Sequence, residues 1–359
     1  MHWDNKVSIN GRIISINSPA YFIADIAANH DGELSRAKDL IWLAKKAGAN
    51  CAKFQHFQAE KIVSDYGFKK LNPDGQSHQS KWKKSVFEIY KQYECPMEWT
   101  EELVETCLEA EIDFMTSPYD FEAVDRLDRH LPAYKIGSGD ITWTQMLEHI
   151  AQKNKPILLA CGASSESDVE RGLQSILKFN SSVVLMQCNT NYTADIKNFH
   201  YVNLNVLNTF KNKYPGMTLG LSDHTSGCST VLGAIALGAR VIEKHFTDDN
   251  ARVGPDHLFA MNPKTWEEMV LRSRELESAM GDGIKRVEKN EEDTVVIQRR
   301  CLRLKKSLMK GDLIKKDFIE ALRPAPQDSF KPYELDLVIG KVINKDKDAG
   351  SAVLYEDIG

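Results

Sequence analysis

Short runs of apolar residues alternate along the chain with longer segments in which apolar residues recur every three or four positions. Each run is apolar almost throughout, which predicts a strand covered on both faces, as in a parallel sheet. The eight runs are YFIADI (21–26), CAKFQ (51–55), IDFMT (112–116), AYKIG (133–137), PILLAC (156–161), VVLMQC (183–188), MTLGL (217–221) and RVIEKHF (240–246). Helices are predicted between and after them, at 34–48, 101–111, 165–177, 229–239 and 263–280.

Eight strand–helix units in about 280 residues are typical of a (β/α)8 TIM barrel. The alternative is a doubly wound sheet, but no G-x-G-x-x-G phosphate loop follows the first strand. The segment from His56 to Trp99 is a long insertion between a strand and its helix, a position that often carries function. Residues 7–15, VSINGRIIS, predict a hairpin that turns at Asn10-Gly11 and is placed to plug the bottom of the barrel.

The pattern changes after the last predicted helix. The charged residues 285–300 predict a linker or a solvated helix, and residues 301–359 are rich in turns and short strands, which indicates a small β-rich second domain. The predicted organisation is a catalytic barrel over 1–284, a linker over 285–300 and the small domain over 301–359.

Composition excludes several classes of protein. The 359 residues include 46 Lys+Arg and 51 Asp+Glu, so a net charge of −5 gives no basic surface for nucleic acid. No apolar stretch approaches the roughly 20 residues of a membrane span, and residues 1–10 lack the apolar core of a signal peptide. A cytoplasmic protein is expected. The seven cysteines form no C-x-x-C, which favours buried thiols over disulfides or a zinc site.

Polar residues stand where the predicted strands end, which is the active-site rim of a barrel of this kind. A structural barrel would not need to gather them there. They are Asp25, Asn29, His30, Lys53, Gln55, Ser117, Lys135, Ser138, Asp140, Tyr192, Ser222, His224, His245 and Asp256.

Lys53 and Lys135 interrupt otherwise apolar strands, where a lysine is costly unless it meets an anion. Either they pair with carboxylates inside the barrel, or they face a phosphate or carboxylate ligand together with Ser117 and Ser138. An acidic protein needs such a local cationic pocket to hold an anion.

His224 and His245 end adjacent strands. Two imidazoles at one barrel mouth suit a divalent transition metal such as Mn²⁺ or Zn²⁺, although a lone histidine is more often a structural residue. His30, in the loop after the first strand, is a further candidate for the site.

Six motifs in order resemble the sialic acid synthase family, which includes N-acetylneuraminate, legionaminate and pseudaminate synthases and spore coat polysaccharide synthases. The resemblance covers nearly the whole chain, and residues 310–326 are similar to the family's C-terminal antifreeze-like (SAF) domain. The motifs are NHDG (29–32), AKFQ (52–55), PAYKIGSGD (132–140), GLSDHT (220–225), ALGARVIEKHF (236–246) and GPDH (254–257).

The resemblance implies condensation of phosphoenolpyruvate with the aldehyde of an N-acylated amino sugar, giving a sialic-acid-like 2-keto acid and phosphate for a surface glycan. It implies a divalent metal, Mn²⁺ or else Mg²⁺ or Co²⁺, on His224 and His245. Phosphoenolpyruvate would lie on Lys53, Lys135, Ser117 and Ser138, and the sugar would contact Tyr192 and Asp256. Arg323 would enter the active site of the other subunit of a domain-swapped homodimer. Contacts with substrate are also expected from Gln55, Ser222, Asn29 and His30.

Two carboxylates depart from the family pattern. Asp25 and Asp140 stand where the family usually has glutamate, and both are expected to take part in catalysis. The changes cluster on the sugar side of the site, which indicates an unusual acceptor. Two alternatives stay open: a related synthase with a phosphorylated aldose acceptor, which would lack the SAF-like tail, and a catalytically weakened sugar-binding homologue.

Overall fold

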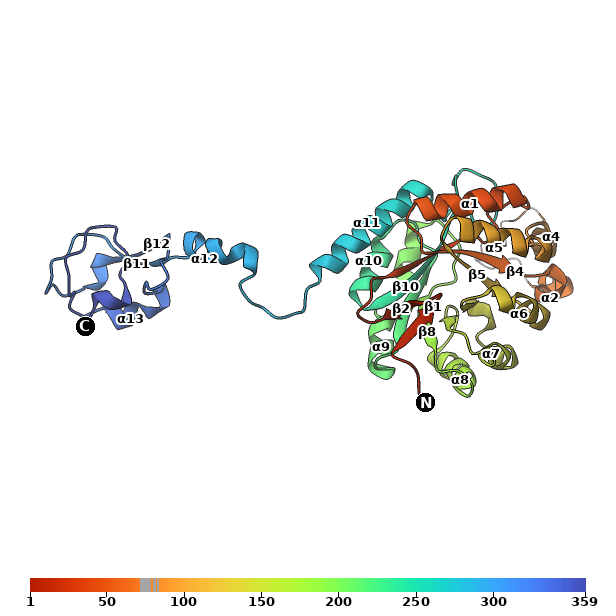
Figure 1. The fold of residues 1–359 in the computed structure, drawn as a ribbon, viewed down its shortest axis with the longest axis horizontal. Helices are drawn as coiled ribbons and strands as arrows, with labels where there is room; N and C mark the ends of the chain where they lie inside the picture. Colours follow the sequence, from red (N-terminus) through yellow and green to blue (C-terminus); the bar gives the residue numbers. More distant parts are fainter. Residues whose placement is uncertain (72–78, 80–81, 83) are drawn as a thin grey trace. The chain divides into compact units, whose positions relative to one another are not determined.

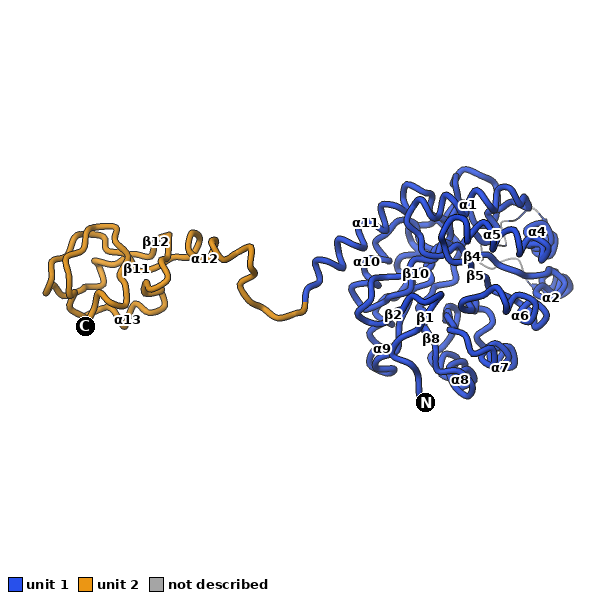
Figure 2. Tube along the Cα trace, viewed as in Figure 1, with its two compact units in different colours: residues 1–281 blue, residues 282–359 orange. Residues whose placement is uncertain are grey.

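The structure is a computed structural model that describes residues 1–359 except 72–78, 80–81 and 83. The chain divides into two compact units, Met1–Gly281 and Asp282–Gly359 (Figure 2). Each unit has its own buried apolar core, and each is described by itself below.

The first unit is built on eight parallel strands in the order β5-β4-β3-β10-β9-β8-β7-β6. Strands that are neighbours in this order are joined by hydrogen bonds. In the described part of the chain no hydrogen-bonded ladder joins the two end strands, β5 and β6, so the barrel is nearly but not fully closed. The strands are β3 (Tyr21–Asp25), β4 (Cys51–His56), β5 (Asp113–Pro118), β6 (Tyr134–Ile136), β7 (Ile157–Ala160), β8 (Val183–Cys188), β9 (Thr218–Asp223) and β10 (Ala239–His245). The predicted TIM barrel is confirmed, and each predicted strand overlaps an observed one.

A principal helix follows each strand and covers the outside of the sheet (Figure 1). The helices are α1 (Leu34–Lys46), α5 (Thr100–Glu109), α6 (Phe121–Leu127), α7 (Thr144–Ala151), α8 (Glu166–Leu177), α9 (Val206–Lys213), α10 (Ser229–Ala236) and α11 (Pro263–Ala279). Every second residue of each strand points outward. These apolar residues, among them Phe22, Phe54 and Ile242, pack with the helices in one large core. Residues at the other parity, such as Tyr21, Ile23 and Val241, fill the barrel interior.

The N-terminal hairpin closes the interior, as predicted. Strands β1 (Lys6–Ile9) and β2 (Arg12–Ser15) pair antiparallel, and Asn10 and Gly11 turn between them with φ of 48° and 80°. This left-handed backbone suits Asn-Gly, since a bulkier pair would be strained there. Val7, Ile9 and Ile14 are buried in the same cluster as Tyr21 and Ile23. Apolar side chains therefore seal the barrel at the end opposite the strand C-termini.

The described residues of the insertion after β4 include three short α-helices, α2 (Ala59–Ile62), α3 (Asp65–Lys70) and α4 (Val86–Gln92). Ser85 caps α4 in a capping box, in which its hydroxyl accepts from the Glu88 N–H and the Glu88 carboxylate accepts from the Ser85 N–H. The apolar–polar pattern alone did not predict these helices. Their importance lies in the side chains that they bring to the mouth of the barrel.

The second unit contains α12 (Glu292–Gln298), α13 (Leu335–Val338) and an antiparallel pair, β11 (Cys301–Leu304) and β12 (Ile319–Leu322). Helix α12 lies within the predicted linker or solvated helix of residues 285–300. All seven cysteines are free. Among the described residues, no helix is long and apolar enough to cross a membrane.

Candidate active site

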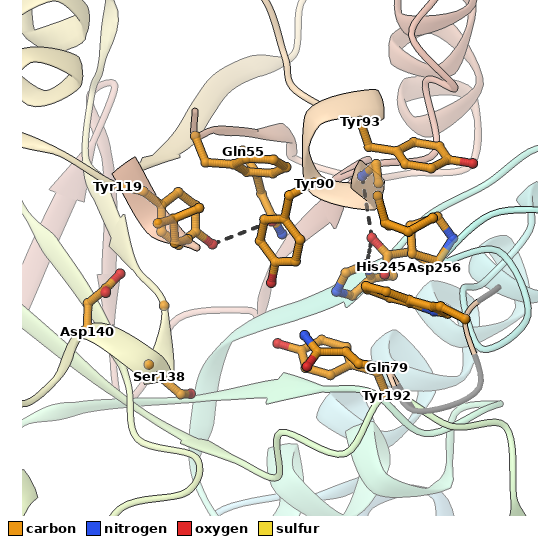
Figure 3. Close-up of a pocket in the computed structure, with 18 residues that line it drawn as sticks. Gln55, Gln79, Tyr90, Tyr93, Tyr119, Ser138, Asp140, Tyr192, His245 and Asp256 are labelled. Atoms are coloured by element: carbon orange, nitrogen blue, oxygen red, sulfur yellow. Dashed lines mark hydrogen bonds and ion pairs between the residues drawn. The ribbon is translucent and has the colours of Figure 1, made fainter. Parts of the chain in front are cut away.

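A cavity of about 380 Å³ opens at the C-terminal ends of the strands (Figure 3). Strand ends and the loops that follow them supply Gln55, Ser138, Asp140, His245 and Asp256 to its lining. Seven further lining residues come from the insertion after β4, namely Phe57, Ile62, Gln79, Trp82, Ile89, Tyr90 and Tyr93. The cavity thus lies where the fold class places active sites, and the insertion forms part of it.

Strand register explains why the charged side chains meet. Successive side chains alternate between the two faces of a strand, so every second residue points into the barrel. Residues Asp25, Lys53 and His245 all share the parity of the interior residues Ile23, Cys51 and Val241. Lys53 and His245 are the register partners of Asp25 on its two neighbouring strands.

Four buried charges inside the barrel form what we call the buried floor. None of them lines the cavity, but the lining residue Gln55 donates a 2.9 Å hydrogen bond to Asp25 Oδ2. Lys53 Nζ lies 2.7 Å from Asp25 Oδ2 and 3.9 Å from Glu243 Oε2, and Lys135 Nζ lies 3.0 Å from Glu243 Oε1. Ser222 Oγ donates a hydrogen bond of 3.1 Å to Glu243 Oε1. Burial opposes ionisation of Glu243, yet the two lysines hold its pKa below the usual range. Two lysines and two carboxylates leave this floor formally neutral.

The sequence left two alternatives for Lys53 and Lys135, pairing with carboxylates or facing an anionic ligand, and this arrangement is compatible with both. Both lysines pair with carboxylates, which explains how they are tolerated in the interior. Two buried oxygens, Glu243 Oε2 and the Oγ of Ser117 (the register partner of Gln55), have no hydrogen-bond partner among the described residues. Buried polar atoms without partners are rare in proteins, so they indicate a place for a ligand or water. Ser138 Oγ accepts a 2.9 Å hydrogen bond from the Gly162 N–H.

The His224 and His245 rings lie together, with centroids 5.3 Å apart. His224 Nδ1 is 2.9 Å from the carbonyl oxygen of Asn189. It must donate to that acceptor, which leaves the Nε2 lone pair free to coordinate. Burial first, and then a neighbouring group (His245 for His224, Lys53 for His245), lower the pKa of each histidine to about 3. Both are thus neutral at physiological pH, which is the form that binds metal.

Buried His245 Nδ1 has no hydrogen-bond partner in the described part of the chain, so the donor set of this pair fits a divalent cation. No group of three or more His, Cys, Asp or Glu side chains is arranged to hold a metal among those residues. Substrate or water oxygens would have to complete the coordination. Tyr192 lies over the pair, with its ring centroid 4.3 Å from His224 and 6.0 Å from His245.

Two carboxyl groups of the lining have raised pKa values. Burial, assisted by the charge of Asp25, raises the pKa of Asp256 to about 7. Burial raises the pKa of Asp140 from 3.8 to about 6, against the opposing charge of Lys135. Asp256 Oδ2 accepts from the Ala28 N–H at 3.4 Å. Carboxyl groups that titrate near neutral pH in a cavity are suited to accept and release protons.

The raised pKa of Asp140 predicts a measurable pH effect. The folded protein favours the protonated side chain, so its contribution to stability is full below pH 3.8 and is lost as the pH rises through about 6. Asp140→Asn cannot titrate. We expect the unfolding free energy of the native protein, relative to that of the variant, to fall between about pH 4 and pH 7 in urea titrations. Parallel pH profiles would contradict this assignment.

Asn29 and His30, which are predicted to bind substrate, lie in the loop after β3. Both are fully buried, and neither lines the cavity. Asn29 Nδ2 donates to the Phe246 carbonyl at 2.9 Å, while the His30 ring packs edge-on against Trp99 at 5.4 Å. These contacts hold the loop after β3. Asn29 Oδ1 and His30 Nε2 are nevertheless buried without a hydrogen-bond partner among the described residues, and the predicted contact of both residues with substrate stays a prediction.

Arg323 is an exposed residue of the second unit, directly after β12, and its predicted role in a partner's active site stays a prediction. Other lining residues were missed by the sequence reasoning. Tyr90, Tyr93, Phe57 and Tyr119 line the cavity, three of them within the long insertion whose position indicated function. Their aromatic character was the available signal, but only the fold shows which of them face inward.

Comparisons with known proteins identify the family of this chain. Residues 40–285 match the NeuB family model, and residues 299–359 match the SAF domain. The N,N'-diacetyllegionaminic acid synthase of Campylobacter jejuni is 35% identical over 327 residues, which cover 90% of this chain and 95% of that protein. The N-acetylneuraminate-9-phosphate synthase of Homo sapiens is 32% identical over 278 residues, which cover 77% of this chain and 76% of that one.

Solved structures give the same result. The spore coat polysaccharide biosynthesis protein SpsE of Bacillus subtilis matches with a TM-score of 0.65 and 28% identity over 99% of each chain. The N-acetylneuraminic acid synthetase of Leptospira borgpetersenii matches with a TM-score of 0.70 and 26% identity, covering 82% of this chain and 96% of that one. The barrel, its polar rim and these likenesses define an enzyme, a synthase of the nonulosonate (sialic-acid-like) type. The chain belongs to the NeuB family and carries a SAF domain after its barrel.

Proposed function

We propose that the enzyme condenses phosphoenolpyruvate with the open-chain aldehyde of an N-acylated amino sugar. The observation that carries the proposal is the buried floor of Lys53 and Lys135, together with the unpartnered Ser117 Oγ and with the histidine pair, of which His245 is the register partner of Asp25. An anion held by the lysines and an aldehyde held near the histidine pair could then bind next to each other. Relatives named as legionaminic, pseudaminic and N-acetylneuraminate-9-phosphate synthases support the same chemistry.

The reaction balances as follows. The enol carbon of phosphoenolpyruvate forms a C–C bond with the aldehyde carbon, whose oxygen takes up a proton. Water adds to C2, and the tetrahedral intermediate expels inorganic phosphate by breaking its C–O bond. The products are a 2-keto acid lengthened by three carbons and phosphate. Most of the acceleration would come from positioning the two substrates and from electrostatic stabilisation.

Lys53 and Lys135 would donate to the phosphate and carboxylate oxygens, and Ser117 Oγ and Ser138 Oγ would add neutral donors. Glu243 and Asp25 keep the lysines in place before the anion arrives. Asp256 carries a proton for part of the time near neutral pH, because burial raises its pKa to about 7. Its Oδ2 lies 3.6 Å from His245 Nδ1, so we assign it proton delivery to the aldehyde oxygen.

The donor set of His224 and His245 fits a divalent ion, for which Mn²⁺ is proposed and Mg²⁺ or Co²⁺ are alternatives. When bound, such an ion would polarise the aldehyde oxygen as a Lewis acid. Tyr192 packs against both imidazoles and would place the sugar beside them. We further propose a domain-swapped homodimer in which Arg323 serves the partner's site, since an acidic chain gains from a further cation near its anionic substrate.

Phosphate release is the test of this function. The protein is incubated with phosphoenolpyruvate, Mn²⁺ and a panel of acceptors, and inorganic phosphate is measured over time. We expect release that depends on an N-acylated amino sugar. Release only with a phosphorylated aldose would assign the related synthase instead. Sugar binding without any release would identify a weakened homologue and would refute the proposed reaction.

A further inference from the structure

A buried ion pair that the proposed reaction does not use lies next to the histidine pair, on the outer face of the same two strands. Lys244 and Asp223 are register partners on β10 and β9, and each directly precedes one of the two histidines. They share the parity of the outward-facing Ile242 and Leu221, so they lie between the sheet and its helices. Their exposed fractions are only 1% for Lys244 and 4% for Asp223.

Lys244 Nζ contacts both residues that flank His224. It donates to Oδ2 of the Asp223 carboxylate and, at 2.5 Å, to the carbonyl oxygen of Thr225. Lys244 is itself followed in the chain by His245. One ammonium group therefore ties the backbone on either side of the first histidine to the backbone that carries the second.

The Asp223 carboxylate is held further by donors from the loop after β9 and from α10. Thr225 Oγ1 lies 3.0 and 2.9 Å from its two oxygens, and the Thr225 N–H donates to Oδ1 at 3.2 Å. Thr230 Oγ1, on α10, donates to Oδ2 at 2.6 Å. Both threonines are buried, so the loss of one of these bonds would leave a polar group unmet away from water, which is costly. We call Lys244, Asp223, Thr225 and Thr230 the outer network.

Stability alone gives little reason for charges at this place, because apolar side chains of similar volume often replace a buried ion pair without loss. A metal site, in contrast, needs its ligands held at one separation, and residues behind the ligands commonly provide this. In the described part of the chain, no group of three or more His, Cys, Asp or Glu side chains is arranged to hold a metal. A displaced His224 or His245 ring could thus not be compensated by a third ligand of these types.

We propose that Lys244 is a positioning residue for the metal site, and that the outer network holds His224 and His245 at the separation at which they bind a divalent ion. Lys244 acts through the backbone, whereas the ion would be bound by the two imidazoles and by oxygens of substrate or water. This inference rests on the proposed function, because it concerns the divalent ion proposed there for the histidine pair.

The first test removes one hydroxyl and measures metal affinity, by electron paramagnetic resonance of free Mn²⁺ during titration of the protein. Thr230→Val takes one donor from Asp223 and should raise the dissociation constant for Mn²⁺ about tenfold, the lower end of the loss for outer partners of metal sites. Thr230→Ser keeps the hydroxyl and should bind Mn²⁺ as the native protein does. Thr218→Val is the matched control and should also be native-like. Thr218 is a buried residue of β9, and its Oγ1 has no hydrogen-bond partner among the described residues.

The second test removes the ion pair itself. Lys244→Met/Asp223→Asn takes away one charge of each sign, and the new amide oxygen still accepts from the two threonines. The metal-free double variant should therefore unfold at nearly the native urea concentration. Its dissociation constant for Mn²⁺ should nevertheless rise about tenfold or more. At saturating Mn²⁺, kcat should fall while KM for phosphoenolpyruvate changes less than about threefold, since the buried floor is untouched.

Native-like Mn²⁺ affinity in a folded double variant would overturn the inference alone, because the outer network would then serve only stability. Equal losses of affinity in Thr230→Val and Thr218→Val would overturn it as well. If circular dichroism shows that the double variant does not fold, the comparison of Thr230→Val with Thr230→Ser and Thr218→Val decides. A native protein that binds no Mn²⁺ would instead refute the metal site of the proposed function, and with it the inference.

Discussion

Replacing His245 by alanine is expected to lower metal-dependent phosphate release by more than about 100-fold. Loss of an outer-shell partner of a metal site already costs about 10–100-fold, and His245 is assigned as a direct ligand. Its Nδ1 is buried without a hydrogen-bond partner among the described residues, and its ring lies 5.3 Å from that of His224. Removing one imidazole of two leaves too few protein donors to hold the ion where the aldehyde would lie.

Two measurements separate this effect from misfolding. Bound Mn²⁺, determined by titration of the metal-free protein, should fall together with activity, while the thermal unfolding temperature should not fall. His200→Ala is the matched control, because His200 is exposed on the segment Ile196–Tyr201 and does not line the cavity. Native-like turnover by His245→Ala at the same Mn²⁺ concentration would show that the assignment of the metal site is wrong.

The fold was largely predictable from the chain because a parallel sheet covered by helices has a simple pattern. Each strand inside two layers is apolar on both faces, so the eight runs marked the strands directly. The Asn10-Gly11 turn was predictable for a local reason, since both residues tolerate the positive φ that the hairpin requires. Residues at the strand ends gave the location of the site, because a barrel brings those ends to one rim.

The partners within the site were harder to predict. A near-continuous apolar strand conceals which parity points inward, so the sequence could not show that Lys135 meets Glu243 across the barrel. The same difficulty applies to Asn29 and His30, because they follow a strand end, yet neither lines the cavity and both contact the surrounding loops. Tertiary packing also decides which aromatic residues of the insertion face inward. Tyr90 and Tyr66 are alike in sequence terms, yet only Tyr90 reaches the cavity.

Replacing Lys135 by methionine should both destabilise the protein and remove phosphoenolpyruvate turnover. The substitution leaves Glu243 buried with only Lys53, at 3.9 Å, as a charged partner. Breaking a buried ion pair from one side costs about 3–5 kcal/mol in unfolding free energy, because the remaining charge is left poorly compensated. Phosphate release should also be lost, since Lys135 is proposed to donate to the anion. The single variant alone cannot separate these two effects.

The double variant Lys135→Met/Glu243→Gln separates them, because it removes one charge of each sign and leaves the floor neutral. Exchanging both partners of a buried pair for uncharged groups is often nearly neutral for stability, so urea unfolding should recover most of the loss. Phosphate release should stay absent, because restoring charge balance does not replace the missing donor to the anion. Recovery of stability without recovery of turnover would therefore assign Lys135 to substrate binding. If the double variant instead regains the native KM for phosphoenolpyruvate, Lys135 serves only to neutralise Glu243, and the anion must lie elsewhere in the cavity.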